Sequence, residues 1–468
     1  MKAWSSEKIS ITALVLLITG AIDSIRNLPA TALFGSKLIF FFVFSAIIFL
    51  IPVALVSAEL SSTWSDEEGG IYSWVQHAFG KSTAFFTIWL QWINTMVWYP
   101  TILLFIASAA AYLINPSLAD SKLYLAAVII TVYWGLTLIG LSGLRASARF
   151  ASFCAIIGMI IPMTLIILLA MFWLIKGNPI AINLSVDNLI PHWKDTQSWI
   201  SLTAIMTSFL GMELAAVHVR NVHNPQRNFP RAMFISVILI LCTMILGSLA
   251  IAFVLPQAKI SLVSGVMQAF TNFFQAYHLT ALIPLIVVMI LIGSVGSMTN
   301  WIISPAKGLM LASNHGFLPR WFYKLNHHGI PSRVLLLQAT LVTLFCGGFL
   351  LFPSINAMYW LYTDLSTEIY ILMYMIMFLA AIRLKRSHAH LERPFSIPGG
   401  PISYYLTCIL GLTGCIITLI VGFFPPDQSM DVGGAGHFRF IFTMGIVIML
   451  APVMISLIYR HVITARSH

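Results

Sequence analysis

Residues 9–33 read ISITALVLLITGAIDSIRNLPATAL, an apolar stretch that is long enough to cross a bilayer but is interrupted near its middle. The interruption contains Gly20 and Asp23, and Arg26 follows just before Pro29. A guanidinium cannot lose its proton in hydrocarbon, so a membrane helix that carries one must open onto a polar cavity or a buried partner. The stretch therefore predicts a broken first membrane helix beside a water-filled site, which is typical of transporters.

The composition of the whole chain indicates a membrane protein. Of its 468 residues, 59% are hydrophobic and 9% are charged, whereas soluble domains carry about 25% charged residues. The expected fold class is therefore an all-α integral membrane protein. Hydropathy predicts twelve transmembrane helices, at residues 9–33, 38–60, 83–113, 123–141, 151–175, 199–219, 232–255, 281–311, 334–351, 357–382, 402–424 and 438–462.

Basic residues are distributed unevenly between the two sides of the membrane. If the chain starts in the cytoplasm, eighteen of its 25 lysines and arginines fall inside and six outside, with Arg26 in the membrane. This asymmetry predicts that both termini are cytoplasmic. It also accounts for the net charge of +10, so we expect no nucleic-acid partner. The five cysteines show no Cys-x-x-Cys spacing, so neither a metal nor a cofactor is expected.

Five carboxylates fall within predicted spans, where each charge costs about 2.5–3.5 kcal/mol and needs a partner or a cavity. They are Asp23, Glu59, Glu213, Asp364 and Glu368. At about 1.5 Å per residue, Asp23, Asp364 and Glu368 lie in the same layer as Arg26. Asp364 and Glu368 also share one helix face. We expect Arg26 to pair with one or both of them across a central cavity, where they could also carry a proton; a static ion pair is the alternative.

A second interruption occurs in the sixth predicted span. Residues 207–213 read TSFLGME, so that Gly211 and Glu213 interrupt an apolar run. The glycine predicts either a broken helix or close packing against a neighbouring helix. Because the first span is interrupted at the corresponding position, we expect a five-plus-five inverted repeat with the site between its halves. The predicted units are residues 1–175, residues 176–382, and residues 383–468 with two further C-terminal helices.

Several sequence blocks resemble one known family. The blocks at 208–213 (SFLGME) and 224–232 (NPQRNFPRA) resemble amino acid/polyamine/organocation (APC) permeases. Further blocks resemble the bacterial glutamate/GABA antiporter subgroup, namely 49–54 (FLIPVA), 58–60 (AEL), 67–75 (EEGGIYSWV), 261–268 (SLVSGVMQ), 393–400 (RPFSIPGG) and 424–427 (FPPD). The resemblance implies a secondary active transporter of the bacterial inner membrane that exchanges amino acids by alternating access.

The resemblance also implies which residues bind the cargo. In this family the opened backbone of helix 1 holds the substrate carboxylate and the opened part of helix 6 holds its amino group. The corresponding residues are Ile22, Asp23, Ser24, Thr207, Phe209 and Gly211. Trp301, with Trp98 or Tyr99, is expected to form an aromatic wall, core or lipid packing being the alternative. The residues expected to gate the site or couple protons are Glu213, Asp364, Glu368, Tyr99 and Ser297.

The chain departs from the family pattern at residues 22–24, at Ser297 and in the acids of the tenth span. Many APC permeases have Gly-Ser-Gly where this chain has Ile22, Asp23 and Ser24, and an acidic side chain there should repel a substrate carboxylate. We therefore expect Arg26 to bind the carboxylate instead. Ser297 stands where the glutamate/GABA subgroup has an acidic residue, and that subgroup does not carry the acids of the tenth span.

The expected partners are an amino acid, a counter-substrate and the lipid bilayer, with protons as a further candidate. The expected assembly is a monomer or a homodimer. The main alternative function is a proton- or sodium-coupled amino acid symporter on the same fold. A membrane-embedded enzyme is a remote alternative because no reactive cluster is placed at a membrane surface. A channel is equally remote because it needs no broken helices.

Overall fold

The computed structural model describes residues 8–65, 67, 70–143, 148–191, 198–199, 202–313, 316–351, 354–425 and 434–466. Within these ranges the regular structure is helical, apart from one isolated bridge between Ile9 and Val222. By length and composition, ten helices could cross a membrane: Ile11–Ala32, Gly35–Thr63, Lys81–Ala111, Lys122–Leu141, Phe153–Ile175, Pro225–Val254, Thr280–Met310, Ile355–Ser387, Gly400–Gly422 and Ala435–Arg460. Shorter apolar helices occupy the predicted sixth and ninth spans, at Leu202–Ala216 and Ser332–Gly348. The predicted all-α membrane fold is confirmed.

The α-helices of the first part of the chain are α1 (Ile11–Ile22), α2 (Leu28–Ala32), α3 (Leu38–Ser45), α4 (Ile51–Thr63), α5 (Ile71–Phe79), α6 (Lys81–Ala111), α7 (Lys122–Leu141), α8 (Ala148–Ala155), α9 (Ile161–Ile175) and α10 (Val186–Leu189). Those of the second part are α12 (Leu202–Thr207), α13 (Pro225–Val254), α14 (Gly265–Ala276), α15 (Ile283–Ser313), α16 (Ser332–Leu351), α17 (Ile355–Ser387), α18 (Gly400–Gly422) and α19 (Ala435–Arg466).

Shorter helical segments connect these helices. The π-helical segments η3 (Ala46–Leu50) and η5 (Ile156–Ile160) join α3 to α4 and α8 to α9. The 3-10 segments are η1 (Ile25–Asn27), η2 (Gly35–Lys37), η4 (Pro116–Asp120), η6 (Met212–Asn221), η7 (Gln257–Lys259), η8 (Thr280–Leu282) and η9 (Arg320–Tyr323).

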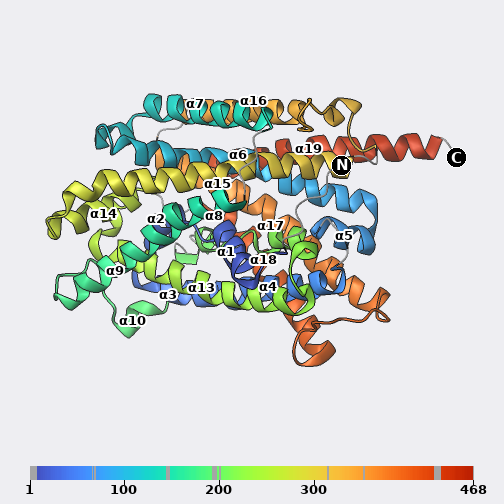
Figure 1. The fold of residues 1–468 in the computed structure, drawn as a ribbon, viewed down its shortest axis with the longest axis horizontal. Helices are drawn as coiled ribbons and strands as arrows, with labels where there is room; N and C mark the ends of the chain where they lie inside the picture. Colours follow the sequence, from blue (N-terminus) through green and yellow to red (C-terminus); the bar gives the residue numbers. More distant parts are fainter. Residues whose placement is uncertain are drawn as a thin grey trace.

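The long helices run roughly along the long axis of the molecule (Figure 1). Helices α7 and α16 lie side by side along one edge, and α4 and α13 lie together on the opposite side. The short helix α5 lies at one end of the bundle, and α10 and α14 lie at the other. Within the apolar 18-residue stretch of each helix, 89% is buried inside the protein in α6, whereas only 17% is buried in α19. Helix α6 is therefore central, whereas α19 lies at the edge that faces lipid.

The first span is interrupted where the sequence predicts it. Helix α1 ends at Ile22, and both Asp23 and Ser24 adopt extended backbone angles. The chain resumes in η1 and α2, and Pro29 lies in the first turn of α2. Proline is tolerated there because the first N–H groups of a helix have no partner within the helix. The break therefore leaves Arg26 on a separate short helical segment.

The sixth span is also interrupted. Helix α12 ends at Thr207, a turn follows, and η6 starts at Met212. Gly211 has a φ of 108°, which glycine adopts without the steric cost that a side chain would impose. Its N–H donates to the hydroxyl of Tyr374 on α17, at 2.8 Å. The sixth helix is thus broken at its glycine.

The two interrupted spans are joined at their far ends. The N–H of Ile9 donates to the carbonyl of Asn221 at 2.7 Å, and the N–H of His223 donates to the carbonyl of Ile9 at 3.1 Å. Ile9, two residues before the start of α1, is therefore hydrogen-bonded to Asn221 and His223 at the end of η6. These two bonds link the start of the first span to the end of the sixth.

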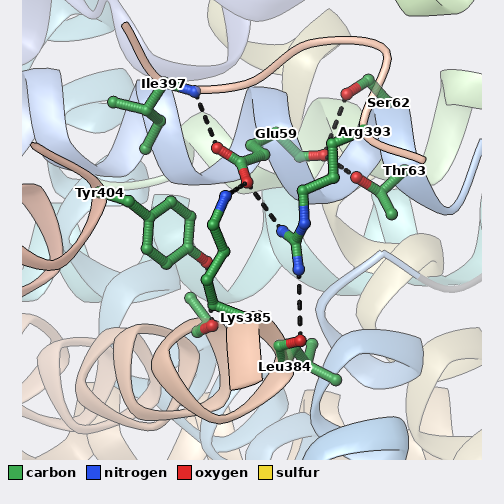
Figure 2. A network of polar contacts seen from close by, with 9 residues as sticks. Glu59, Ser62, Thr63, Leu384, Lys385, Arg393, Ile397 and Tyr404 are labelled. Atoms are coloured by element: carbon green, nitrogen blue, oxygen red, sulfur yellow. Dashed lines mark hydrogen bonds and ion pairs between the residues drawn. The ribbon is translucent and has the colours of Figure 1, made fainter. Parts of the chain in front are cut away.

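Glu59, one of the acids in the predicted spans, has three partners at the end of α4. Its Oε1 accepts from Lys385 Nζ and Arg393 Nη1, both at 2.7 Å, and its Oε2 accepts from the N–H of Ile397 at 2.8 Å (Figure 2). The residue is completely buried. Lys385 and Arg393 also lie over the ring of Tyr404, at 4.3 and 5.9 Å. This Glu59 cluster ties α4 to the end of α17 and to the start of α18.

Helix α17 reaches the Glu59 cluster because it is longer than predicted. It continues to Ser387, whereas hydropathy places the end of the tenth span at residue 382. Hydropathy marks where the hydrocarbon ends, not where the helix ends. The extra residues include Lys385, a cation in the last turn of the helix, where the helix dipole favours positive charge.

Replacing Glu59 should destabilise the protein strongly. Glu59→Gln leaves the partly buried cations Lys385 and Arg393 without a counter-charge, which should lower the free energy of unfolding by about 3 kcal/mol, the lower end of the range for a broken buried pair. The matched control is Glu67→Gln, because the side chains of Glu67 and its partner His77 are 41% and 37% exposed. An exposed pair contributes at most about 1 kcal/mol. Unfolding in detergent measures both variants, and equal losses would contradict the assignment.

Candidate functional site

A cavity of about 120 Å³ lies between the two interruptions. Nine of the residues predicted for the site line its wall, namely Ile22, Asp23, Ser24, Arg26, Trp98, Thr207, Gly211, Ser297 and Trp301. Further wall residues come from α6, α17 and the region where η5 meets α15. The fold thus brings both breaks and the predicted aromatic residue of α15 to one cavity.

Arg26 is a buried cation in the cavity wall, 5% exposed. Its Nη1 donates to Thr101 Oγ1 on α6 at 2.8 Å, and its guanidinium carbon lies 5.0 Å from the centre of the Trp98 ring. The cation–π contact offsets part of the cost of burial. Among the described residues, the Nε atom has no hydrogen-bond partner. Arg26 therefore has neutral partners and an unused donor at Nε.

The expected pairing of Arg26 with Asp364 or Glu368 is wrong for this structure. Among the described residues no ion pair joins Arg26 to either acid. In the part of the chain that the structure describes, Asp364 Oδ1 and both carboxylate oxygens of Glu368 have no hydrogen-bond partner. Glu368 faces α18, since a Cβ atom added to Gly422 would clash with its Oε1. Position along a helix predicts the depth of a residue but not the direction in which its side chain points.

Glu213 lies behind the cavity wall and accepts hydrogen bonds from three side chains. Its Oε1 accepts from the hydroxyl of Tyr370 at 2.7 Å and from Gln91 Nε2 at 3.4 Å. Its Oε2 accepts from the hydroxyl of Tyr374. Tyr370 lines the cavity, and Tyr374 also accepts from the N–H of Gly211. Glu213 therefore connects the cavity wall on α17 to the break in the sixth span.

Two other predicted residues, Tyr99 and Phe209, lie outside the cavity wall. The hydroxyl of Tyr99 donates to the carbonyl of Trp301 at 2.7 Å, and its ring lies 5.2 Å from that of Tyr133. The ring of Phe209 lies 5.7 Å from that of Phe42 on α3. Tyr99 thus supports the aromatic wall from behind, and Phe209 belongs to the packing between α3 and the sixth span.

Six polar wall residues are absent from the sequence-based prediction. They are Asn27 on η1, Asn94 and Thr95 on α6, Ser294 on α15, and Ser366 and Tyr370 on α17. Ser366 donates to Asn94 Oδ1 at 3.4 Å, so the two helices meet through polar groups at the cavity. Polar side chains at a spacing of four residues inside apolar spans, such as Ser366 with Tyr370, are the signal that could have identified them.

The chain is similar in sequence and in fold to known membrane transporters. Residues 9–451 match the model of the amino acid permease family. An uncharacterized transporter of Legionella pneumophila is 40% identical over 424 residues, which covers 91% of each chain. The glutamate/gamma-aminobutyrate antiporter of Lactococcus lactis is 29% identical over 427 residues, or 90% of this chain and 85% of that protein. The manganese transporter of Eremococcus coleocola has a similar fold, with a TM-score of 0.64 at 14% identity, over 96% of this chain and 94% of that chain.

The match to the permease model covers nearly the whole chain and includes both interrupted spans. The described residues contain ten helices that could span a membrane. The chain is therefore a multi-pass membrane transporter, not an enzyme, and it belongs to the amino acid permease family of the APC superfamily.

Proposed function

We propose that this protein exchanges one amino acid for another across the bacterial inner membrane by alternating access. The cargo would bind in the cavity between the breaks of the first and sixth spans. The similarity to a glutamate/gamma-aminobutyrate antiporter supports exchange over one-way transport. The Lys and Arg asymmetry of the loops supports cytoplasmic termini. Residues 1–175 and 176–382 would form the inverted halves, and residues 383–468 the last two helices.

The observation that carries this proposal is the position of Arg26. It is a buried guanidinium in a cavity wall, with neutral partners and an unused Nε donor. Guanidinium groups bind carboxylates through two parallel hydrogen bonds, and a carboxylate also supplies the missing negative charge. The carboxylate of an amino acid is thus the complement of Arg26.

Other residues have supporting roles in this proposal. Thr207, Ser297 and Trp301 contact the cargo, and Tyr99 holds the Trp301 backbone. The gate consists of Glu213 with Tyr370 and Tyr374, because these residues connect the cavity wall to the sixth-span break.

A proton-coupled symporter is the second candidate function. The observation that favours it is the pair of buried acids on α17, Asp364 and Glu368. Three of their carboxylate oxygens have no hydrogen-bond partner, and a buried carboxylate without a counter-charge is strongly disfavoured unless it binds a proton. The two acids are therefore the positions at which a coupled proton would be carried.

Counterflow in liposomes distinguishes the two functions. Liposomes loaded with unlabelled glutamate, γ-aminobutyrate, arginine or a neutral amino acid should take up the labelled form of an exchanged amino acid, whereas empty liposomes should not. Uptake into empty liposomes that is driven by an imposed proton gradient would instead establish symport.

Arg26→Gln should weaken binding of the exchanged amino acid by about 10- to 150-fold, the loss expected for a hydrogen bond to a charged group. The matched control is Arg439→Gln. The guanidinium of Arg439 also lies 5.0 Å from the centre of a ring, that of Phe424, but Arg439 is exposed and outside the cavity wall. A similar loss of affinity in both variants would remove Arg26 from the binding site.

Tyr374→Phe tests the gate. The substitution removes the hydroxyl that donates to Glu213 and accepts from the Gly211 N–H, so the exchange rate should fall about tenfold. Affinity should change little because Tyr374 does not line the cavity. The control is Tyr362→Phe on the same helix, which removes a hydroxyl that donates to the carbonyl of Phe345. Equal rates in the two variants would argue against a gate at Glu213.

A further inference from the structure

Asp23 is a second buried ionisable residue in the cavity wall, 3% exposed. Its Oδ2 accepts from Thr243 Oγ1 on α13 at 2.7 Å, but its Oδ1 has no hydrogen-bond partner among the described residues. Arg26 does not neutralise it, since no ion pair between the two residues occurs in the described part of the chain. The cavity wall therefore contains a carboxyl oxygen that can accept a hydrogen bond from a ligand.

The backbone around Asp23 also favours a cation. Asp23 is the C-cap of α1, and the C-terminal end of a helix carries a partial negative charge. The last carbonyls of α1 belong to Gly20, Ala21 and Ile22, and none of the described residues donates a hydrogen bond to them. All three residues line the cavity. A carboxylate oxygen and the end of a helix dipole thus concentrate negative potential at one position.

Two cavity-lining residues at the break in the sixth span, Thr207 and Gly211, have carbonyls that already accept hydrogen bonds. The carbonyl of Thr207 accepts from the N–H of Leu210 at 3.3 Å, and the carbonyl of Gly211 accepts from the N–H of Leu214 at 3.1 Å. The hydroxyl of Thr207 is bonded to the carbonyl of Thr203 and to the hydroxyl of Thr367. A cargo ammonium group would have to compete with these bonds.

We propose that Asp23 is the counter-ion of the cargo's ammonium group, so that the cargo lies along the break of the first span with its carboxylate on Arg26. This inference rests on the proposed function, namely that an amino acid binds in this cavity. It differs from the arrangement implied by the family resemblance, in which the sixth span holds the amino group. One negative and one positive wall residue match a molecule that carries both charges.

The cargo class follows from this pairing. A carboxylic acid without an ammonium group leaves Asp23 buried and unpaired, and an amine without a carboxylate does the same to Arg26. Leaving one partner of a buried charge pair unpaired costs enough to lower affinity about 30-fold or more. The site should therefore select amino acids and reject both kinds of analogue.

The test compares each exchanged amino acid with its deamino and decarboxylated analogues as inhibitors of exchange in liposomes. For γ-aminobutyrate these analogues are butyrate and propylamine. The wild-type protein should prefer the amino acid to both. Asp23→Asn should lose the preference over the deamino analogue but keep the preference over the decarboxylated one. Arg26→Gln should show the opposite pattern.

A control variant separates charge from packing. Thr243→Val removes the hydrogen bond to Asp23 Oδ2 but keeps the carboxylate, so it should retain the preference for the amino acid over its deamino analogue. The inference is wrong if Asp23→Asn weakens the amino acid and the deamino analogue equally, because Asp23 would then be structural. It is also wrong if the variant loses only a dependence on Na⁺, since the site would then hold a metal cation.

The failure of this inference can be told apart from failure of the proposed function. If no amino acid exchanges in the wild-type protein, the proposed function itself is wrong. If exchange occurs and Asp23→Asn prefers the amino acid over its deamino analogue as strongly as the wild type does, only the assignment of Asp23 is wrong. Thermal unfolding in detergent verifies that each variant is folded.

Discussion

Charges inside a membrane-spanning bundle must be compensated, and the ways in which this protein compensates them organise its structure. Glu59 is compensated completely by two cations and a backbone N–H, and its cluster joins three helices. Since both carboxylate oxygens are occupied, the cluster stabilises the bundle and offers little to a ligand. Asp23 and Arg26 are compensated only in part, and each keeps a polar atom without a partner beside the cavity.

The helix breaks explain why this partial compensation is tolerated. Unwound residues at Asp23 and Gly211 expose backbone groups that would be costly in contact with lipid, but the cavity and neighbouring helices surround them. Tyr374 bonds both to the Gly211 N–H and to Glu213, so the sixth-span break is coupled to α17. A cargo that contacts Tyr370 in the cavity wall would act on the same acid. In the proposed function, binding would therefore be coupled to helix movement through Glu213.

Helix α17 contains two buried acids. Asp364 and Glu368 lie on one helix and are buried, but they have oxygens without partners and form no ion pair with Arg26. Their depth could be estimated from the sequence. Their surroundings could not, because Glu368 faces Gly422 on α18, a contact that depends on how α17 is rotated about its axis.

The sequence by itself determined the membrane-spanning segments and the two interruptions, because hydropathy and the effects of Gly211, Pro29 or Arg26 on a helix act locally. It also indicated the wall residues at the two breaks, since residues at the breaks must face a polar space. Only the tertiary structure decided which groups each of these side chains contacts. Arg26 contacts Thr101 and Trp98 instead of an acid, and Phe209 packs against Phe42. The physical reason is that side-chain direction depends on the rotation and packing of whole helices, which no local pattern encodes.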